Sequence, residues 1–412
     1  MSSHITSCRV CGNSNLESVL DLGVQRLTGV FPSPEEAKRV EGGPLELVLC
    51  SGSSACGLVQ LRHSFPAEKM YGDSYGYRSG LNPTMVTHLR QISELAKELV
   101  HLNPGDIVVD IGSNDGTMLG FFDSSLKLIG IDPSANKFQR FYRNDVIRIP
   151  DFFSAERLQP HMLQKKAKLI TSIAMMYDLE DPIGFASQVA ECLDDNGIWI
   201  FEQSYLPTMI EQLAYDTVCH EHIEYYGVKQ LDWILQKAGL KIVDLTFSDS
   251  NGGSVAVIAT HMSSQMPSNE RKIRESIDIE TSLDMSSLKT YEVFAEKVER
   301  NREELRRFLQ IWKDDGLKVA GLGASTKGNV LLQYIGATSN EISFIGDINP
   351  DKGGKVTPGT EIPIISEQQC LDSDPDVLIV LPWHFAAFFE TAPQFKGRRL
   401  FFPLPVPRIF VP

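Results

Sequence analysis

The stretch Ile107–Leu119, IVVDIGSNDGTML, decides the predicted fold. Its apolar run ends at Asp110, a turn with Gly112 and Gly116 follows, and we expect a helix to open from that turn. Such a run is typical of a central parallel strand, and glycines let the backbone turn tightly without a Cβ clash. Ligands bind at the carboxyl ends of such strands. The stretch therefore predicts a nucleoside-binding site on a doubly wound sheet.

A second predicted strand, KLIGIDPS, ends at Asp132, which lies 20 residues after Gly112. At this distance an acid usually accepts hydrogen bonds from ribose hydroxyls. The turn GSNDG lacks the GxGxxG pattern that holds a pyrophosphate, so a ligand without phosphates fits better. Asp110 and Asp115 also suit a cation, and S-adenosylmethionine carries both a sulfonium and an ammonium group. The pattern favours a methyltransferase over other nucleotide-binding folds.

Length and charge exclude several classes of protein. A chain of 412 residues is long enough for two or three domains. A net charge of -14 argues against sequence-independent nucleic-acid binding, which needs Lys and Arg to neutralise phosphates. The N-terminus lacks a basic-then-apolar signal segment, and no apolar run reaches the roughly 20 residues that span a bilayer. We expect a cytoplasmic protein that binds neither nucleic acid nor membrane, and its oligomeric state stays open.

Four of the seven cysteines lie near the N-terminus: Cys8 and Cys11 in CRVCG, then Cys50 and Cys56 in CSGSSACG. Two thiolates from each of two turns can surround zinc tetrahedrally, and the first pair has the usual C-x-x-C spacing. The second pair is wider, so its turn must bulge. A closed shell of four thiolates leaves no position for substrate, so the predicted zinc is structural. Reduced, partly buried thiols are the alternative.

Alternating strands and helices are predicted after Pro104, which indicates a doubly wound parallel sheet. A helical pattern, VTHLRQISELAKELVHL, precedes it. Charged residues recur with helical spacing from 268 to 315, which predicts a solvated connector without chemistry. The last 100 residues alternate again and predict another small α/β domain. The strands of the first sheet are predicted at 107–112, 127–132, 168–177, 197–205, 241–247 and 252–261.

The segment YDTVCHEHIEYYG, 215–227, is too polar for packing alone and follows a predicted core strand, where substrate loops belong. A neutral histidine can take a proton from carbon next to a carbonyl, and a neighbouring carboxylate such as Glu221 can orient the ring. We therefore expect residues of this loop to act in general acid–base catalysis. Metal binding by His220 and His222 is an alternative without a recognisable further ligand, and satisfied surface histidines are another.

The turn GLGASTKGN, 321–329, contains GxG after a predicted strand, which invites a nicotinamide interpretation. Alternatively, Lys327 and the hydroxyls of Ser325 and Thr326 can bind the diphosphate of a nucleotide-linked substrate, since a helix N-terminus and a lysine both favour anions. Both interpretations stay open on these residues.

Seven motifs occur here in one order: the paired cysteines, YGDSYGYRSG, VVDIGSNDG, FEQSY, CHEH, NGGS and GASTKGN. That order resembles the three-domain sugar C-methyltransferases that act on nucleotide-linked ketosugars, and the resemblance spans nearly the full length. It implies an α/β protein: a class I methyltransferase sheet with a small N-terminal zinc-binding module and a C-terminal Rossmann-like domain. The implied boundaries are 1–70 for the zinc module, 71–265 for the S-adenosylmethionine domain, 266–315 for the helical connector and 316–412 for the substrate-binding domain.

The resemblance also implies site residues. His222 matches the base of the HEH motif, Glu221 and His220 lie beside it, and Tyr75 or Tyr77 matches a substrate-facing tyrosine. Some members carry a His where this chain has MMYDLEDP, so either Tyr177 substitutes for it or the substrate differs. The implied cofactor-binding residues are Asp110, Gly112, Asn114, Asp115, Gly116, Asp132, Glu202 and Gln203. The implied substrate-binding residues are Tyr177, Ser325, Thr326, Lys327 and Asn329. The implied zinc ligands are Cys8, Cys11, Cys50 and Cys56.

The implied reaction is deprotonation of a sugar carbon next to a 4-keto group, followed by attack of the enolate on the methyl of S-adenosylmethionine. Methylation of oxygen or nitrogen on another small molecule is the first alternative. A nicotinamide-dependent oxidoreductase that uses GLGAST, and a zinc-anchored scaffold without catalysis, are the rivals from other classes.

Overall fold

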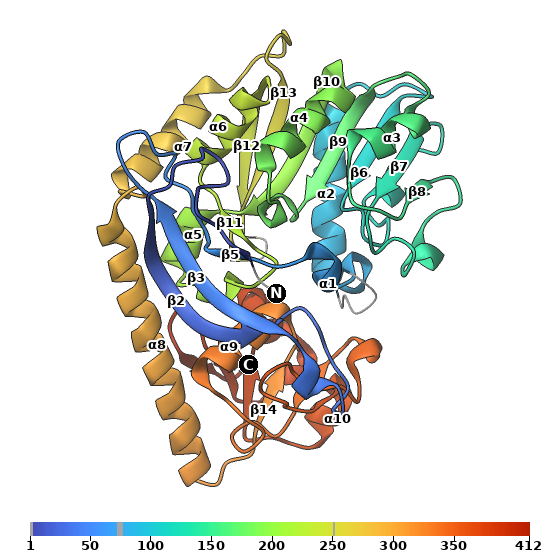
Figure 1. Cartoon of the computed structure of the whole chain (residues 1–412). Helices are drawn as coiled ribbons and strands as arrows, with labels where there is room; N and C mark the ends of the chain where they lie inside the picture. The colour runs from blue at the N-terminus through green and yellow to red at the C-terminus, as the bar shows by residue number, and fades with distance from the viewer. Residues whose placement is uncertain (1–2, 72–76, 250–251) are drawn as a thin grey trace.

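A computed structural model describes residues 3–71, 77–249 and 252–412. Its central sheet has the order β12-β13-β10-β9-β6-β7-β8 (Figure 1). The strands run parallel except β13, which is antiparallel to both of its neighbours. This is the predicted doubly wound sheet. Its strands are β6 (Ile107–Ile111), β7 (Lys127–Ile131), β8 (Ile147–Ile149), β9 (Ala167–Ile173), β10 (Leu193–Ser204), β12 (Leu240–Ser248) and β13 (Ser254–His261).

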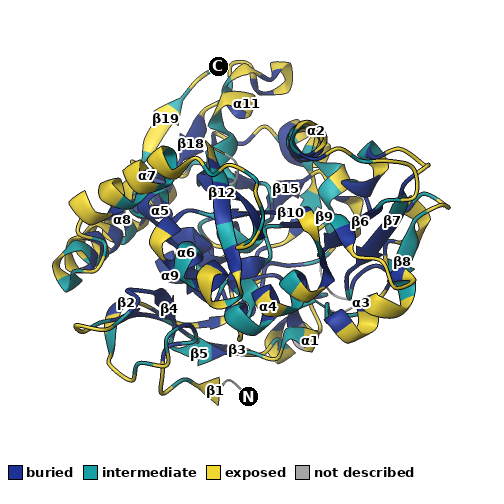
Figure 2. Cartoon of the chain, turned by 90° about the horizontal axis from the view of Figure 1, so that it is seen from above, coloured by how far each residue is buried: buried dark blue, intermediate teal, exposed yellow. Residues whose placement is uncertain are grey.

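Apolar alternation along β6 explains the two layers of the core around this sheet. Val109 joins the cluster under α4 and α6, whereas Val108 joins the cluster under α2. Successive strand residues point to opposite faces, so one strand contributes to both layers. Figure 2 shows the strands buried between helices whose outer faces are exposed. The helices of this region are α2 (Pro83–Leu99), α3 (Ala155–Met162), α4 (Pro182–Cys192), α5 (Leu206–Glu211), α6 (Val228–Lys237) and α7 (Glu270–Ser282).

The prediction of a helix directly after the GSNDG turn is wrong. Residues 112–118 form turns, and only a short 3₁₀ segment, Leu119–Phe121, follows. Gly112, Asn114 and Gly116 all have positive φ, which a right-handed helix does not allow.

The N-terminal region forms a sheet with the order β11-β4-β3-β2, in which β11 comes from the HEH segment. Leu61 donates its backbone N–H to the carbonyl of Ile223, which continues this pairing. The sequence did not predict this shared sheet. In Figure 1 the long β2–β3 ribbon runs beside α8 toward the C-terminal domain. The strands here are β1 (Ser3–His4), β2 (Leu16–Arg26), β3 (Gly42–Cys50), β4 (Val59–Leu61), β5 (His63–Ser64) and β11 (Glu224–Tyr225), and α1 is Ala67–Met70.

The connector predicted as solvated contains α8 (Leu288–Asp314), and that prediction is wrong for one face of the helix. Buried residues recur every three or four positions along α8, so an apolar stripe packs against β2 and the C-terminal domain while the charges face outward. Helix α8 therefore connects the N-terminal β2–β3 ribbon with the C-terminal domain. The buried residues are Tyr291, Phe294, Val298, Asn301, Leu305, Leu309 and Trp312.

The C-terminal region is the predicted second α/β domain, with the sheet order β16-β15-β14-β17-β18-β19. Only its edge strand β19 pairs antiparallel among the described strands of this sheet. No helix in the described part of the chain is both long and apolar enough to cross a bilayer. The elements are β14 (Val319–Leu322), α9 (Thr326–Ile335), β15 (Ile345–Asp347), β16 (Ile364–Ser366), α10 (Glu367–Asp372), β17 (Val377–Val380), α11 (Ala386–Thr391), β18 (Leu400–Phe402) and β19 (Arg408–Phe410).

Candidate active site and zinc centre

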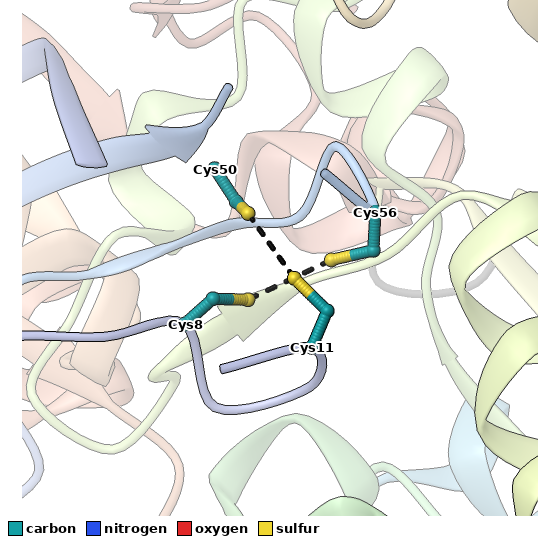
Figure 3. A group of neighbouring side chains, drawn as sticks. All are labelled: Cys8, Cys11, Cys50 and Cys56. Carbon is teal, nitrogen blue, oxygen red and sulfur yellow. Dashed lines mark hydrogen bonds between the residues drawn. The ribbon is translucent and has the colours of Figure 1, made fainter. Parts of the chain in front are cut away.

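The four N-terminal cysteines converge on one point (Figure 3). The Sγ atoms of Cys8 and Cys56 are 3.6 Å apart, those of Cys11 and Cys50 are 3.4 Å apart, and all four lie within 4.8 Å of one another. Tetrahedral zinc with Zn–S bonds of about 2.3 Å needs sulfurs about 3.8 Å apart, so the cluster fits a structural zinc ion. The Asn13 side-chain amide donates to Cys50 Sγ over 3.4 Å, as partners of metal ligands commonly do.

The zinc module is tied to the central domain. The side-chain amide of Gln230, on α6, donates to the carbonyl of Cys56 over 2.8 Å. Arg9, between the first two cysteines, donates to the carbonyl of Leu61 over 2.7 Å, and Leu61 is the β4 residue that pairs toward the HEH segment. The zinc therefore stabilises a platform for that segment and has no open position for chemistry.

A cavity of about 540 Å³ opens where β6, β7 and β9 end. The N-terminal region, the central domain and the C-terminal domain all contribute residues to its wall. The cavity therefore forms only when these three regions pack together. Among its lining residues are Tyr71, Tyr77, Asp110, Gly112, Asn114, Asp132, Phe153, Met175, Tyr177, Asp178, Glu221, His222, Ser325, Thr326, Lys327 and His384.

One end of the cavity holds acids predicted to bind the cofactor. Asp110 accepts a hydrogen bond from Thr171 Oγ1 over 2.7 Å, and burial raises the pKa of Asp110 to about 7. Asp132 accepts from the backbone N–H of Asn114 over 2.9 Å and from Ser134, and burial raises its pKa as well. Asn114 and Gly112 also line the cavity. A cation such as the ammonium of S-adenosylmethionine would favour the charged form of these acids.

Asp115 and Gly116 are absent from the cavity wall among the described residues. Asp115 accepts from the backbone N–H of Gly80 over 2.9 Å and from Thr117 Oγ1 over 2.6 Å, so it holds the N-terminal segment against the glycine turn. Any Cβ at position 116 would lie 2.8 Å from the ring of Tyr142. Both residues shape the turn that carries Asn114.

Glu202 and Gln203 also lie behind the wall in the part of the chain that the structure describes. Glu202 contacts His88 Nε2 on α2 at 2.8 Å. The side chain of Gln203 is buried, and neither of its polar atoms has a hydrogen-bond partner among the described residues. Their predicted contact with cofactor stays a prediction.

His222 faces the cavity as a neutral ring. Its Nδ1 lies 2.9 Å from the carbonyl of Thr217, so Nδ1–H donates there and Nε2 is left as the proton-accepting nitrogen. The ring packs against Tyr177 with centroids 4.3 Å apart. Burial, with a contribution from the charge of Lys327, lowers the pKa of His222 to about 3. The group that orients the ring is thus the Thr217 carbonyl, which accepts this hydrogen bond. The sequence had suggested the Glu221 carboxylate for this role.

Glu221 lines the same cavity, and His220 does not. Glu221 Oε2 accepts from Thr28 Oγ1 at 3.5 Å, and a Cβ at position 29 would come within 2.0 Å of Oε1, so a larger residue there would displace the Glu221 carboxyl. His220 packs edge-on against Phe65 with centroids 4.6 Å apart, and burial lowers the pKa of His220 to about 4. His220 therefore anchors the loop to the N-terminal region.

The predicted tyrosines divide as follows. Tyr177 and Tyr77 both line the cavity, and the carbonyl of Tyr77 accepts from the side chain of Asn114 over 3.3 Å. Tyr75 lies outside the described residues.

The GASTKG turn brings Ser325, Thr326 and Lys327 to the opposite wall. Ser325 Oγ caps α9 by accepting from the backbone N–H of Gly328 over 3.0 Å. Burial lowers the pKa of Lys327, and the nearby carboxyl of Asp216 opposes that change. Asn329 points elsewhere.

The amide of Asn329 donates to the carbonyl of Thr28 over 2.7 Å, so it fastens the N-terminal ribbon to α9. Within the described chain Asn329 is not part of the cavity wall.

Asp178 and His384 are among the titratable lining residues that sequence reasoning missed. Asp178 follows β9 and His384 follows β17, so both stand at the carboxyl ends of parallel strands. Applied to every strand, the rule that ligands bind at those ends would have found them. Burial and the charge of Lys327 lower the pKa of His384 well below its usual range.

Comparisons with known proteins agree with this architecture. Residues 8–71 match a zinc-binding domain family, residues 86–245 a methyltransferase domain, and residues 249–407 the C-methyltransferase C-terminal domain. The C-methyltransferase NovU of Streptomyces niveus is 30% identical over 414 residues, which cover 98% of this chain and 97% of NovU.

Solved structures with partial similarity include two methyltransferases. Mitomycin 7-O-methyltransferase MmcR is 12% identical, with a TM-score of 0.34 over 44% of this chain and 55% of that chain. The CcbJ methyltransferase of Streptomyces caelestis is 13% identical, with a TM-score of 0.33 over 42% of this chain and 89% of that chain.

The central sheet and the matched domains define an S-adenosylmethionine-dependent methyltransferase with a structural zinc site. More narrowly, the chain belongs to the C-methyltransferase family that includes NovU. The fold class, the family, the enzyme class, the methyl donor and the zinc predicted from the sequence are confirmed.

Proposed function

We propose that this enzyme methylates a carbon next to the keto group of a nucleotide-linked 4-ketosugar, with His222 as the base. The observation that carries this proposal is the neutral ring of His222, whose Nδ1 is held by Thr217 and whose Nε2 is the proton acceptor, on the wall of the same cavity as Asp110 and Asp132. A carbon next to a carbonyl is far more acidic than an ordinary C–H group, so its proton is the one that a positioned general base can remove.

The chain's own residues serve the first half of the reaction. The C–H bond breaks, its proton moves to Nε2 of His222, and its electron pair enters the carbonyl to give an enolate. Bound S-adenosylmethionine supplies a methyl group that accepts this electron pair, while its sulfur keeps the pair of the broken C–S bond. Asp110 and Asp132 are proposed to position the ammonium and the ribose of that donor, because both carboxyls lie on the wall beside the glycine turn.

A second hollow supports a nucleotide-linked substrate. Its volume is about 330 Å³, and the segment 77–81 separates it from the main cavity: Tyr77 and Ser79 face the cavity, whereas Arg78 and Leu81 face the hollow. The charged residues that line it are Arg78, Lys137, Arg140, Lys352, Lys355 and Asp351.

Cations dominate this hollow although the chain as a whole carries a charge of -14. A diphosphate is the complement of such a lining, because lysine and arginine bind phosphate oxygens with charge-assisted hydrogen bonds. Phe31 and Phe138 add apolar surface on which a base can pack. Lys352 Nζ also donates to the carbonyl of Ala324 over 2.6 Å, so the hollow adjoins the GASTKG turn.

The test is a direct assay with pure enzyme, S-adenosylmethionine and nucleoside-diphosphate-linked 4-ketosugars. We expect a product one methylene heavier, whose carbon NMR spectrum shows a new methyl on a ring carbon next to the carbonyl. The control acceptor is the same nucleotide sugar with a 4-hydroxyl group, which lacks the acidic C–H bond and should stay unmethylated. A methyl found on oxygen or nitrogen, or equal turnover of the 4-hydroxyl sugar, would contradict the proposal.

A further inference from the structure

Asp178 is a lining acid that the reaction above does not use. It ends the 3₁₀ segment Met176–Asp178, directly after β9, and lies on the cavity wall that also carries His222. Asp178 Oδ2 accepts a hydrogen bond from the hydroxyl of Tyr71 over 2.6 Å. Its other oxygen, Oδ1, is buried and has no hydrogen-bond partner within the part of the chain that the structure describes. Because Asp178 lines the cavity, a bound substrate can supply the partner that this atom lacks.

We propose that Asp178 donates a hydrogen bond from Oδ1 to the substrate oxygen that becomes negative when His222 removes the proton. This inference rests on the proposed function, because it assigns the group that stabilises the enolate. It assigns that role to a carboxylic acid.

The surroundings of Asp178 favour the uncharged acid that such a donor needs. Burial raises the pKa of Asp178 well above its usual range, and the charges of Glu221 and Glu224 raise it further. The hydrogen bond from Tyr71 opposes this effect. An uncharged acid still satisfies Tyr71, since its carbonyl oxygen accepts that bond while the O–H on Oδ1 points to the substrate. An ionised carboxylate would instead present a second acceptor to the developing oxyanion.

The geometry of the two groups suits proton removal. His222 and Asp178 flank Tyr177, because the His222 ring packs on Tyr177 and Asp178 is the next residue in the chain. The backbone N–H of Ile223 also donates to the Tyr177 carbonyl over 2.9 Å, which fixes the HEH loop to this segment. A carbonyl and its neighbouring C–H bond are adjacent in the substrate, so a base and a donor held on neighbouring residues can reach both at once.

The test compares Asp178→Asn with Asp178→Ala. Asparagine has the shape of the uncharged acid and the same pattern, with one oxygen to accept from Tyr71 and an N–H to donate to the substrate. We therefore expect Asp178→Asn to keep kcat within about tenfold of wild type. Loss of one preorganised donor costs roughly 100- to 1,000-fold in kcat, and that loss is expected for Asp178→Ala. Asp195→Asn, at an exposed position of β10 outside the cavity wall, is the matched control and should keep wild-type turnover.

A second readout separates the donor role from folding and from methyl transfer. With S-adenosylhomocysteine in place of the methyl donor, NMR in D₂O follows exchange of the acidic hydrogen of the ketosugar. Asp178→Ala should slow this exchange while calorimetry shows unchanged affinity for S-adenosylhomocysteine, and Asp178→Asn should exchange nearly as fast as wild type.

The outcomes distinguish the two proposals. Wild-type turnover in Asp178→Ala, or a loss in Asp178→Asn as large as in Asp178→Ala, would overturn the donor role while the proposed function stands. Should wild-type enzyme neither exchange the hydrogen nor methylate any ketosugar, the proposed function fails and the donor role falls with it.

Discussion

The Nδ1 atom of His222 lies 2.9 Å from the carbonyl oxygen of Thr217, and this contact selects the tautomer in which Nε2 accepts a proton. Thr217 ends the 3₁₀ segment Tyr215–Thr217, five residues before His222, so the HEH loop folds back to orient its own base. His222, the proposed base, is thereby aligned without a paired carboxylate. Its basicity is consequently lower than that of a histidine held by Asp or Glu, and the adjacent carbonyl of the substrate must supply the acidity.

Substituting this histidine should remove turnover and leave cofactor binding intact. A positioned general base is worth about 100- to 10,000-fold, so His222→Asn is expected to lose at least about 100-fold in kcat. Calorimetry should show unchanged affinity for S-adenosylhomocysteine. His101→Asn, at an exposed position, is the control. Wild-type turnover by His222→Asn would reject the assignment of the base.

The pH dependence of the reaction follows from the low pKa of His222. Because burial lowers that pKa to about 3, the ring is neutral and able to accept a proton throughout the mildly acidic range. Protonation would remove the base only as the pH falls through about 3. We expect kcat/KM for the acceptor, at saturating S-adenosylmethionine, to show no acid limb between about pH 8 and about pH 5. An acid limb with an apparent pKa near that of free histidine, absent from the residual rate of His222→Asn, would contradict this.

Asp132 should contribute to binding of the methyl donor. If its carboxylate accepts hydrogen bonds from ribose, Asp132→Ala lowers the affinity for S-adenosylhomocysteine by roughly 1 to 3 kcal/mol. Isothermal titration calorimetry measures this change directly. Asp123→Ala removes an exposed acid of the same domain and should have no effect. Equal affinities of the Asp132 variant and wild type would count against the ribose contact.

Zinc should be required for folding of the N-terminal module. Elemental analysis of wild-type enzyme is expected to give one zinc per chain, and Cys56→Ser should lose the metal and several degrees of Tm, because structural metal binding contributes to folding free energy. Cys192→Ala, a buried cysteine outside the cluster, should keep its zinc. A metal-free wild-type protein with an unchanged Tm in chelator would exclude the site.

The basic hollow should set the affinity for the acceptor. Hydrogen bonds to charged groups are worth about 1.5 to 3 kcal/mol, so the double variant Arg140→Gln, Lys355→Gln should raise KM for a nucleotide-linked sugar at least roughly tenfold. Its affinity for S-adenosylhomocysteine should be unchanged. Arg300→Gln, on the exposed face of α8, serves as the control. A KM equal to wild type would place the diphosphate elsewhere.

Local sequence patterns predicted much of this molecule, because the interactions concerned are local. Strand β6 and its glycine turn, Asp132 at the end of β7, and the two cysteine turns each depend on neighbours in the chain. The failed helix after GSNDG has a local cause as well. Asp115 accepts from the backbone and hydroxyl of Thr117, and that turn competes with helix formation.

The rest depended on contacts between distant segments. Sequence alone determined that the chain has a nucleoside-binding sheet, a cluster of four thiols and a polar HEH loop, since periodicity and spacing record those features. Only the tertiary structure decided that β4 pairs with β11, that Asp178 and His384 share a cavity with His222, and that the Thr217 carbonyl orients the His222 ring. These contacts form when burial of apolar surface packs the three regions together. The contacting residues lie far apart in the sequence, so no periodic pattern predicts them.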